Sequence, residues 1–499
     1  MRPFDLFIDG EDRPAEGGRT AASLDPSTGE PWAEVAAASV ADVGRAVDSA
    51  SAAFGRREWA DLPVEGRALV LERIAELVFE RQDELVDVEM ADAGGTLRWA
   101  TTANIPATAQ TFQSFATLLR EQVLEEAYEE EVPVPSRNLI TREPYGVVAA
   151  IVPWNFPLAS AAWKVAPALA AGNSLVLKPS PLTPCSALLL ARICADAGVP
   201  PGVFNVVCGP EDALGEALVR HPAVRKIAFT GSTPVGKHIT RLAAERLVPV
   251  SLELGGKSPD IFLEDADLDI AIPGALFGTF FHSGQICTSG TRLLVPRARH
   301  DDIVDRLVEQ AGRIRVGDPK DPDTNMGPLI SAGHRSRVDG YVRLGREEGA
   351  RCVTGGSVPK GLDRGYYYAP TILTGVNNAM RVAREEIFGP VVCVIPYDDE
   401  AEALRIANDS DFGLAAAIWS RDEVRALRLA RRIEAGTVWI NDYHLLSPRF
   451  PFGGYKQSGA GRELGRAGLE DYSQLKHIHV GQSSTLEEKH YFAFTIGDA

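Results

Sequence analysis

The chain has 499 residues, a formal net charge of −17 at pH 7, 45% hydrophobic residues and 24% charged residues. This composition is typical of a globular protein, and the length predicts two or three domains rather than a single core. The negative charge argues against a nucleic-acid partner, because phosphate binding needs concentrated Lys and Arg. It also argues against an anionic membrane surface as partner.

The six cysteines are scattered along the chain, without a C-x-x-C pair and without a His cluster at metal-ligand spacing. We therefore expect free thiols in a reducing compartment and no metal site. The first residues, MRPFDLFIDGEDRP, lack the apolar core of a signal peptide, which predicts a cytoplasmic protein.

Residues from about 40 to 120 are predicted to be helical, because apolar residues recur there at the spacing of one helix face, as at Leu71, Ile74, Leu77, Val78 and Leu85. Residues 121–144 differ in character. An acidic cluster is followed by a polar, strand-like piece, which is either a linker or an excursion at a sheet edge.

From Tyr145 onward, short apolar strands alternate with helices, and a second such series begins after Gly255. This alternation predicts α/β architecture with two doubly wound, largely parallel sheets. The first segment, Tyr145–Gly172, is apolar for long enough to suggest a membrane span. Its three prolines and Lys164 favour a buried strand, a loop and a helix instead.

The stretch GSTPVGKH, from Gly231 to His238, nearly matches a phosphate-binding P-loop, but His238 occupies the position of the Mg²⁺-binding hydroxyl. An ATPase is therefore disfavoured. A strand followed by a helix start can still bind a dinucleotide phosphate, although an ordinary strand–helix turn has the same pattern. Lys178 follows another predicted strand at the edge where open α/β sheets bind ligands, and its alternative is a solvated loop lysine.

Four further stretches carry candidate chemistry. PWNFP fixes Asn155 between prolines, where its amide is suited to an oxyanion, or to a structural turn. Glu253 ends an apolar strand before two glycines, which suits a general base or a solvent-facing carboxylate. Cys287 lies among small polar residues, which we expect to be flexible, although free cysteines are more often inert buried residues. EEIFGP places Glu386 before a Gly-Pro turn.

Together these stretches resemble the aldehyde dehydrogenase superfamily. The matching motifs, in family order from about residue 20 to residue 480, are PWNFP, WKVAPALAAGN, LKPS, AFTGST, LELGGKSP, GQIC, EEIFGPV and PFGGYKQSGAGRELG. The resemblance implies an NAD(P)-binding Rossmann-like domain at 1–121 and 145–255 and a catalytic domain at 256–470. A bridging β element at 122–144 and 471–499 would join subunits into a homodimer or homotetramer.

The resemblance also implies roles for four residues. Cys287 would attack the aldehyde carbon as the nucleophile, and hydride transfer would leave a thioester on its sulfur. The Asn155 amide and the Cys287 backbone N–H would hold the oxyanion. Glu253 would activate the water that releases the carboxylic acid, and Lys164 would serve as a proton relay near these groups.

The cofactor implied is NAD⁺. In the family, the positions of Lys178 and Glu386 bind ribose hydroxyls, those of Gly231 and Ser232 lie at the pyrophosphate, and apolar positions flank the two rings. The full set of expected cofactor positions is Ile151, Pro153, Trp154, Lys178, Ser180, Pro181, Gly231, Ser232, Val235, Leu254, Glu386 and Phe388. Pro181 departs from the Glu of many NAD⁺-dependent members, which removes the repulsion of a 2′-phosphate and makes NADP⁺ the second expected cofactor.

The expected substrate pocket is aromatic and apolar: Phe156, Trp163, Phe281, Leu446, Phe450 and Phe452. Such a lining favours medium-chain aliphatic or aromatic aldehydes. Arg449 allows a semialdehyde as an alternative, although a surface role fits this residue better. The segment after Val480 is expected either to pack on a neighbouring subunit or tunnel mouth, or to be a disordered tail.

Three rival functions differ in class from a hydrolytic dehydrogenase. A coenzyme A-acylating enzyme on the same fold would have no use for a water-activating base at Glu253. A catalytically idle structural or binding member would not need Cys287, Glu253, Asn155 and Lys178 together. A P-loop ATPase would turn over ATP without any aldehyde.

Overall fold

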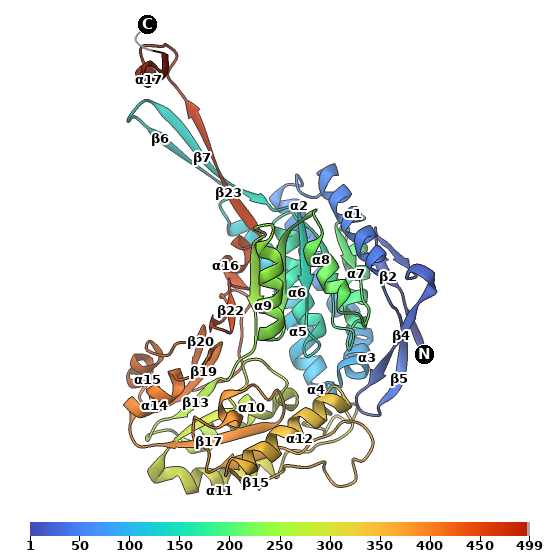
Figure 1. Ribbon diagram of the computed structural model, residues 1–499, viewed down its shortest axis with the longest axis vertical. Helices are drawn as coiled ribbons and strands as arrows, with labels where there is room; N and C mark the ends of the chain where they lie inside the picture. Colours follow the sequence, from blue (N-terminus) through green and yellow to red (C-terminus); the bar gives the residue numbers. More distant parts are fainter. Residues whose placement is uncertain (497–499) are drawn as a thin grey trace.

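Two parallel-stranded sheets with their helices form the body of the molecule, and a narrow antiparallel arm projects from it (Figure 1). This computed structural model describes residues 1–496. The predicted fold class, two doubly wound α/β units with an additional small β element, is confirmed. Over the described residues, no helix combines the length and the apolar character that crossing a membrane requires.

The first sheet has eight strands, of which the five central ones are parallel. Parallel strands buried on both faces read as continuous apolar runs, as these do. The strand order is β22 (Gly459–Ala460), β12 (Val250–Glu253), β11 (Val224–Thr230), β8 (Val147–Ile151), β9 (Ser174–Lys178), β10 (Phe204–Val206), β2 (Leu6–Ile8) and β3 (Glu11–Arg13).

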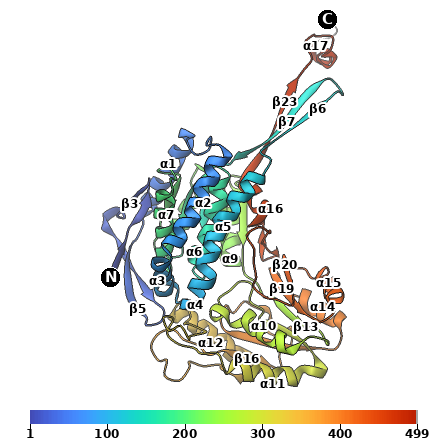
Figure 2. The same ribbon diagram turned by 180° about the vertical axis from the view of Figure 1, so that it is seen from behind.

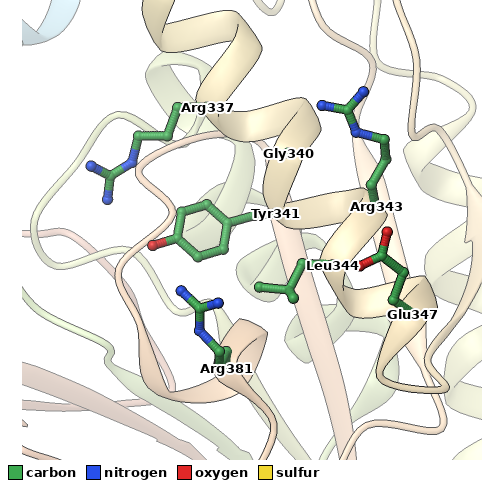
Figure 3. A pocket seen from close by; sticks show the side chains of 7 residues that line it. All are labelled: Arg337, Gly340, Tyr341, Arg343, Leu344, Glu347 and Arg381. Atoms are coloured by element: carbon green, nitrogen blue, oxygen red, sulfur yellow. The ribbon is translucent and has the colours of Figure 1, made fainter.

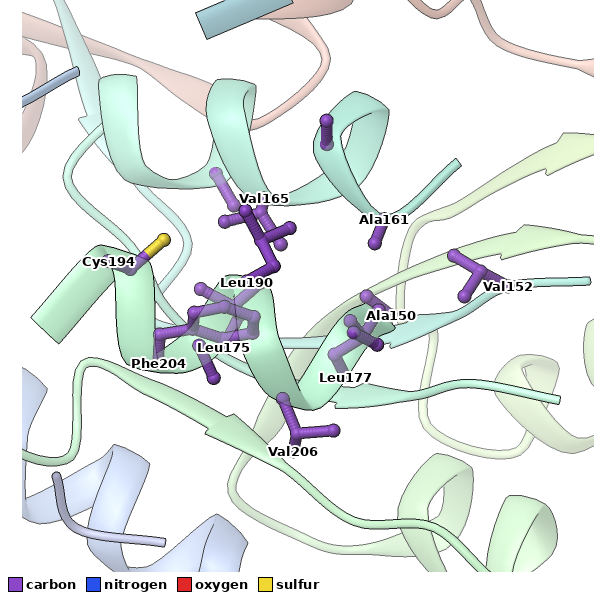
Figure 4. Packing of buried hydrophobic residues seen from close by; sticks show 14 of the residues in the cluster. Ala150, Val152, Ala161, Val165, Leu175, Leu177, Leu190, Cys194, Phe204 and Val206 are labelled. Carbon is purple, nitrogen blue, oxygen red and sulfur yellow. The ribbon is translucent and has the colours of Figure 1, made fainter. Parts of the chain in front are cut away.

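Helices cover both faces of this sheet. One face carries α1 (Val40–Arg56), α8 (Ala213–Arg220) and α9 (Thr233–Ala244), and the other carries α6 (Pro157–Ala170) and α7 (Cys185–Asp196). Figure 4 shows how α6 and α7 place apolar side chains, among them Val165 and Leu190, over Leu175 and Leu177 of β9. Behind them lie α2 (Val64–Glu80), α3 (Gln82–Ala93) and α5 (Ile105–Glu121) (Figure 2).

The helical stretch predicted between residues 40 and 120 contains one irregularity. The single-turn helix α4 (Leu97–Trp99) continues into a π-helical segment at Ala100–Asn104 before α5 begins. Such segments frequently lie at functional sites, and this one directly follows Trp99, which is buried.

The second sheet has seven strands, parallel except for the edge pair β15–β16. The order is β15 (Arg351–Thr354), β16 (Thr371–Thr374), β17 (Val391–Tyr397), β14 (Arg292–Pro296), β13 (Pro259–Phe262), β19 (Ala415–Trp419) and β20 (Thr437–Ile440). One face packs on α10 (Leu268–Phe280) and α11 (His300–Ala311). The other packs on α12 (Ala332–Glu347), α13 (Arg381–Arg384), α14 (Glu400–Asn408) and α15 (Glu423–Ala430).

The arm is a three-stranded antiparallel sheet of β6 (Glu125–Glu130), β7 (Ser136–Pro144) and β23 (Ser473–Gly481). Its tip carries the segment after Val480, which ends in the short helix α17 (Ala493–Ile496) (Figure 1). Two smaller sheets complete the fold: β1 (Arg2–Phe4), β5 (Glu30–Ala36) and β4 (Thr20–Asp25), and the pair β18 (Phe412–Gly413) and β21 (Tyr455–Lys456).

The chain crosses back to the first sheet near its carboxyl end. β22 lies within the range expected for the second domain, yet it pairs antiparallel with β12, Gly459 opposite Glu253. The glycine- and serine-rich sequence around it allows this close approach, since a Cβ at Gly459 would lie 2.3 Å from the Leu252 carbonyl oxygen. The segment from Pro451 to α16 (Gly465–Glu470) therefore reaches the end of β12.

Candidate active site

The predicted catalytic residues meet where the carboxyl ends of β8, β11 and β12 face the segment after α10. Asn155 follows β8, Glu253 ends β12, and Cys287 lies beyond a short 3₁₀ turn, Phe281–Gly284, that follows α10. Ligands of open α/β sheets bind at such carboxyl ends, so the topology alone makes this edge of the sheet a candidate ligand-binding site. Among the described residues, no cluster of three or more His, Cys, Asp or Glu is arranged to hold a metal ion.

The stretch around Cys287 is buried and held by hydrogen bonds, which corrects the expectation of a flexible segment. The Ser283 hydroxyl donates to the Gly327 carbonyl at 2.8 Å. The Gln285 side-chain oxygen accepts from the Ile330 N–H at 2.9 Å. Small side chains here serve close packing, because a Cβ at Gly284 would lie 2.3 Å from the Gly389 carbonyl oxygen.

Cys287 is half-buried, and all six cysteines are free. Burial, followed by the Glu386 and Glu253 carboxylates, raises the pKa of the Cys287 thiol to about 12. The backbone N–H groups of Cys287 and Thr288 act in the opposite direction and favour the thiolate. In the absence of ligand the sulfur is therefore a protonated thiol that must lose its proton to react.

Asn155 is buried, and its amide nitrogen donates to the Gln285 carbonyl oxygen at 2.8 Å. An amide nitrogen carries two hydrogens, so this bond leaves the second one free for another acceptor. The bond also ties the loop after β8 to the segment that carries Cys287.

Glu253 is 4% exposed, which excludes the solvent-facing alternative. Burial raises the pKa of its carboxyl to about 8, although Lys164 and Arg462 act to lower it. Its Oε2 atom has no hydrogen-bond partner within residues 1–496. A buried carboxylate with a free oxygen and a pKa near neutrality is suited to exchange protons with a bound molecule.

Lys164 is fully buried on α6, where its ammonium donates to the Thr230 hydroxyl at 2.7 Å and forms an ion pair with Glu463. Burial lowers the pKa of Lys164 to about 7. Glu463 is a site residue that we did not predict, although it lies within the PFGGYKQSGAGRELG motif. Its backbone exchanges two hydrogen bonds with Phe452, at 2.6 and 2.7 Å.

Gly255 and Gly256, which follow shortly after Glu253, leave room for the carboxylate of Glu386. The Gly256 N–H donates to Glu386 Oε1 at 3.0 Å, and a Cβ at Gly255 would lie 2.3 Å from Glu386 Oε2. A Cβ at Gly256 would lie 2.4 Å from the Cys287 carbonyl oxygen. Glycine thus lets the carboxylate of Glu386 and the backbone of Cys287 approach the same turn.

The other predicted cofactor positions surround the carboxyl end of the first sheet. Lys178 ends β9, and burial lowers the pKa of its ammonium. Ser232 is the residue before α9, and its hydroxyl makes no capping hydrogen bond. The His238 ring pairs with Glu216, away from any phosphate role.

Trp154 and Phe388 form an edge-to-face pair with ring centroids 5.2 Å apart, and His334 packs against both. The ring of His334 donates to the Phe388 carbonyl at 2.6 Å and was not among the predicted residues. The remaining positions lie on the same strand ends and on α9: Ile151 at the end of β8, Pro153 after it, Ser180 and Pro181 after β9, Gly231 after β11, Val235 in α9 and Leu254 after β12.

Two of the six predicted pocket residues contact each other, and two more pack against neighbouring rings. Trp163 and Phe452 meet edge to face at 5.2 Å, Phe156 is half-buried beside His282, and Phe281 packs against Phe277. Leu446 and Phe450 lie on the surface, 38% and 69% exposed. Arg449 is also exposed, as its surface alternative required.

A hollow of about 350 Å³ lies on the outer face of α12 (Figure 3). Two of its arginines already have protein partners, since Arg381 pairs with Glu385 and Arg337 donates to the Glu386 carbonyl at 2.7 Å. It contains no nucleophile or general base of the kind found at Cys287 and Glu253. The lining residues are Arg337, Gly340, Tyr341, Arg343, Leu344, Glu347 and Arg381.

Known proteins are similar to this chain over nearly its whole length. The profile of the "Aldehyde dehydrogenase family" matches residues 13–478. Betaine aldehyde dehydrogenase of Bacillus subtilis is 43% identical over 477 residues, covering 95% of this chain and 96% of that protein. A putative aldehyde dehydrogenase of the same organism, DhaS, is 42% identical over 480 residues, covering 95% of each.

Solved structures are similar over the same length. The crystal structure of betaine aldehyde dehydrogenase from Staphylococcus aureus in complex with NAD⁺ has a TM-score of 0.94 and 38% identity, and covers 96% of this chain and 95% of that one. The structure of a mutant aldehyde dehydrogenase from Bacillus cereus has a TM-score of 0.94 and 40% identity and covers 97% of each chain.

Proposed function

The chain belongs to the aldehyde dehydrogenase family, and from this premise we propose that it oxidises an aldehyde to the carboxylic acid with NAD⁺, through a thioester on Cys287. The observation that carries the proposal is the convergence of a thiol, a side-chain amide and a buried carboxyl group. Cys287, Asn155 and Glu253 come from three distant parts of the sequence and face one place.

The first step is attack of the Cys287 sulfur on the aldehyde carbon. The thiol loses its proton as the S–C bond forms, and the carbonyl oxygen becomes an oxyanion. The free hydrogen of the Asn155 amide and the Cys287 backbone N–H would hold this oxyanion. Because the resting thiol is protonated, its proton passes to bulk water as the S–C bond forms, and the backbone N–H groups of Cys287 and Thr288 favour the thiolate.

The residues present fit a nicotinamide dinucleotide. The Gly255–Gly256 turn holds Glu386 where a ribose hydroxyl would bind, Lys178 offers a second ribose contact, and the unused Ser232 hydroxyl precedes α9 where a pyrophosphate binds. When bound, NAD⁺ supplies a hydride acceptor. Pro181 carries no charge to repel a 2′-phosphate, so NADP⁺ is the second candidate cofactor.

Gly255→Ala should weaken NAD⁺ binding about tenfold or more, because the new Cβ displaces Glu386 and breaks a charge-assisted hydrogen bond. Titration of NAD⁺ by fluorescence measures this Kd. Gly215→Ala on α8 is the matched control, since nothing lies within 4 Å of its Cβ. Equal NAD⁺ affinity in the two variants would remove Glu386 from the cofactor site.

The second half of the reaction is hydrolysis of the thioester. Glu253 would take a proton from the attacking water, and the released acid would leave Cys287 as a thiol. Lys164, with a pKa near 7 and its partner Glu463, would relay the proton from this buried place. A water-activating group of this kind favours the hydrolytic enzyme over the coenzyme A-acylating alternative.

For the substrate, we propose an aldehyde whose non-reacting part packs on aromatic side chains. Phe156, Trp163 and Phe452 suit medium-chain aliphatic or aromatic aldehydes. Betaine aldehyde is the second candidate, because relatives that are 43% identical carry its name and aromatic faces attract a quaternary ammonium group. A semialdehyde is a third candidate, with exposed Arg449 as the only support.

The test is NADH formation by the purified protein with hexanal, benzaldehyde, betaine aldehyde and succinic semialdehyde, each with NAD⁺ and NADP⁺. The highest kcat/KM identifies the substrate class, and acid rather than acyl-coenzyme A must be the product when coenzyme A is added. Absence of NADH formation with every aldehyde, from protein that binds NAD⁺, would favour the idle alternative.

We also propose that the arm joins this chain to a second copy. Strand β23 exposes Leu475, Ile478 and Val480, and an isolated three-stranded sheet has little apolar surface of its own to bury them. Sedimentation velocity should therefore report a dimer or tetramer. A monomer at micromolar concentration would contradict this assignment.

A further inference from the structure

His282 is a buried histidine that the proposed reaction does not use. It lies five residues before Cys287 and is 6% exposed. Burial lowers the pKa of its ring to about 4, so the ring is neutral near pH 7. No other group in the described part of the chain accepts or donates a hydrogen bond at its Nε2 atom. Leaving a buried polar atom unpaired lowers the stability of the fold, so we expect an offsetting contribution from the packing of the ring.

The ring of His282 packs against two aromatic side chains that also contact each other. It stacks on Trp99 with centroids 4.4 Å apart and an angle of 9° between the planes, and it meets Phe156 at 5.2 Å. Trp99 and Phe156 also touch each other, at 5.5 Å. Gly95 admits the Trp99 ring, because a Cβ there would lie 2.1 Å from it. The three rings thus connect α4 to the loop that carries Asn155.

The backbone of His282 adopts a conformation that a side chain disfavours. His282 has φ +48°, and the next two residues, Ser283 and Gly284, have φ +59° and +69°. A non-glycine residue in this left-handed region is disfavoured, because its Cβ crowds the following carbonyl oxygen. Such strain persists only where the surroundings hold it, and it is concentrated at functional sites.

This left-handed turn fixes the position of Gln285. The His282 carbonyl accepts hydrogen bonds from the Gln285 backbone N–H at 3.2 Å and from its side-chain amide at 3.3 Å. The Gln285 carbonyl in turn accepts the bond from the Asn155 amide at 2.8 Å. His282 therefore reaches Asn155 through Gln285, through the ring of Phe156, and directly, by a hydrogen bond of its ring with the Asn155 backbone.

We propose that His282 is a positioning residue for Asn155: its ring, packed against both Trp99 and Phe156, holds the left-handed turn and the loop after β8 so that the free amide hydrogen of Asn155 meets the oxyanion. The inference rests on the proposed function, in which Asn155 stabilises that oxyanion. His282 acts through another residue and needs no contact with the reacting atoms.

Two substitutions separate the ring stack from the backbone turn. His282→Phe keeps an aromatic ring against Trp99 and Phe156 but loses both nitrogens, whereas His282→Asn tolerates the left-handed backbone but loses the stack. The measurement is the single-turnover rate of NADH formation at saturating NAD⁺. We expect about 10- to 100-fold slowing in His282→Asn, below the loss of a whole oxyanion donor, and a rate within about threefold of wild type in His282→Phe.

Two readouts distinguish positioning of Asn155 from general damage. The Kd for NAD⁺ and the rate of Cys287 alkylation by iodoacetamide should stay within about twofold of wild type in His282→Asn. In an Asn155→Ala background, His282→Asn should add less than about twofold, because the group that it positions is already gone.

A wild-type single-turnover rate in His282→Asn would overturn the inference, and so would equal slowing with and without Asn155. If His282→Asn does not fold, Trp99→Leu replaces it, with Trp99→Phe as the variant that keeps the stack; a wild-type rate in Trp99→Leu would then overturn the inference. A wild-type protein that forms no NADH overturns the proposed function instead, so the two failures are distinguishable.

Discussion

Cys287→Ala should form NADH at least about 10⁵-fold more slowly than wild type with the best aldehyde, because the covalent route is lost. No other group near the oxyanion site offers a nucleophile with the sulfur's reactivity. The measurement is steady-state NADH absorbance, with intact-protein mass spectrometry to show that the acyl adduct of the wild type is absent from the variant. The Kd for NAD⁺ should stay nearly unchanged.

Cys352→Ala is the matched control for this substitution. Cys352 is also a free, half-buried thiol, but it lies on β15 at the edge of the second sheet. Its replacement should leave turnover and single-site alkylation by iodoacetamide intact. Retained turnover in Cys287→Ala, or lost turnover in Cys352→Ala, would assign the chemistry to another group.

Glu253→Gln should separate the two halves of the reaction. Oxidation should still yield a burst of about one NADH per site, after which hydrolysis should be slowed about 10²- to 10⁴-fold, because no base activates the water. Rapid-quench sampling should find the acyl group on Cys287. Glu245→Gln is the control, since Glu245 is exposed at the end of α9 and pairs only with Arg220. A variant without a burst would mean that Glu253 is needed earlier, to activate the thiol.

The pH dependence follows from the same carboxyl group. Burial raises the pKa of Glu253 to about 8, so below that pH most of the enzyme holds the protonated, inactive acid. The hydrolysis rate of the wild type should therefore rise with pH, reach half of its maximum near pH 8 and level off above it. In Glu253→Gln this rise should disappear. A wild-type rate that is flat between pH 6 and pH 9 would contradict the assignment of Glu253 as the base.

The sequence is sufficient to predict the two sheets, and it places the candidate site residues at strand ends, because both depend on local signals. Apolar strands alternating with amphipathic helices specify a doubly wound fold, and Asn155, Glu253 and Lys178 each follow a predicted strand at the edge where ligands bind. The glycines after Glu253 are visible as a motif, and the structure supplies their reason, the approach of Glu386.

The residues that sequence reasoning missed act through contacts between distant segments. Glu463 lies beside Lys164 because β22 pairs with β12. No periodicity in the sequence predicts that pairing. No motif in the sequence marks Trp99 or His282, whose rings stack only because the fold brings two distant segments together. The rigidity around Cys287 was likewise hidden, because small polar residues serve a flexible loop and a tightly packed turn equally well.

The late return of the chain to β12 has a consequence for biosynthesis. Lys164 and Glu463 are separated by more than half of the chain, and the nucleophile lies between them. On the ribosome, Cys287 is made well before the segment that completes the buried ion pair. The machinery is therefore assembled only when translation is almost finished, and a product terminated before Glu463 carries the thiol without the partner of Lys164. If this pair relays the proton as proposed, such a product would lack the hydrolytic half of the reaction.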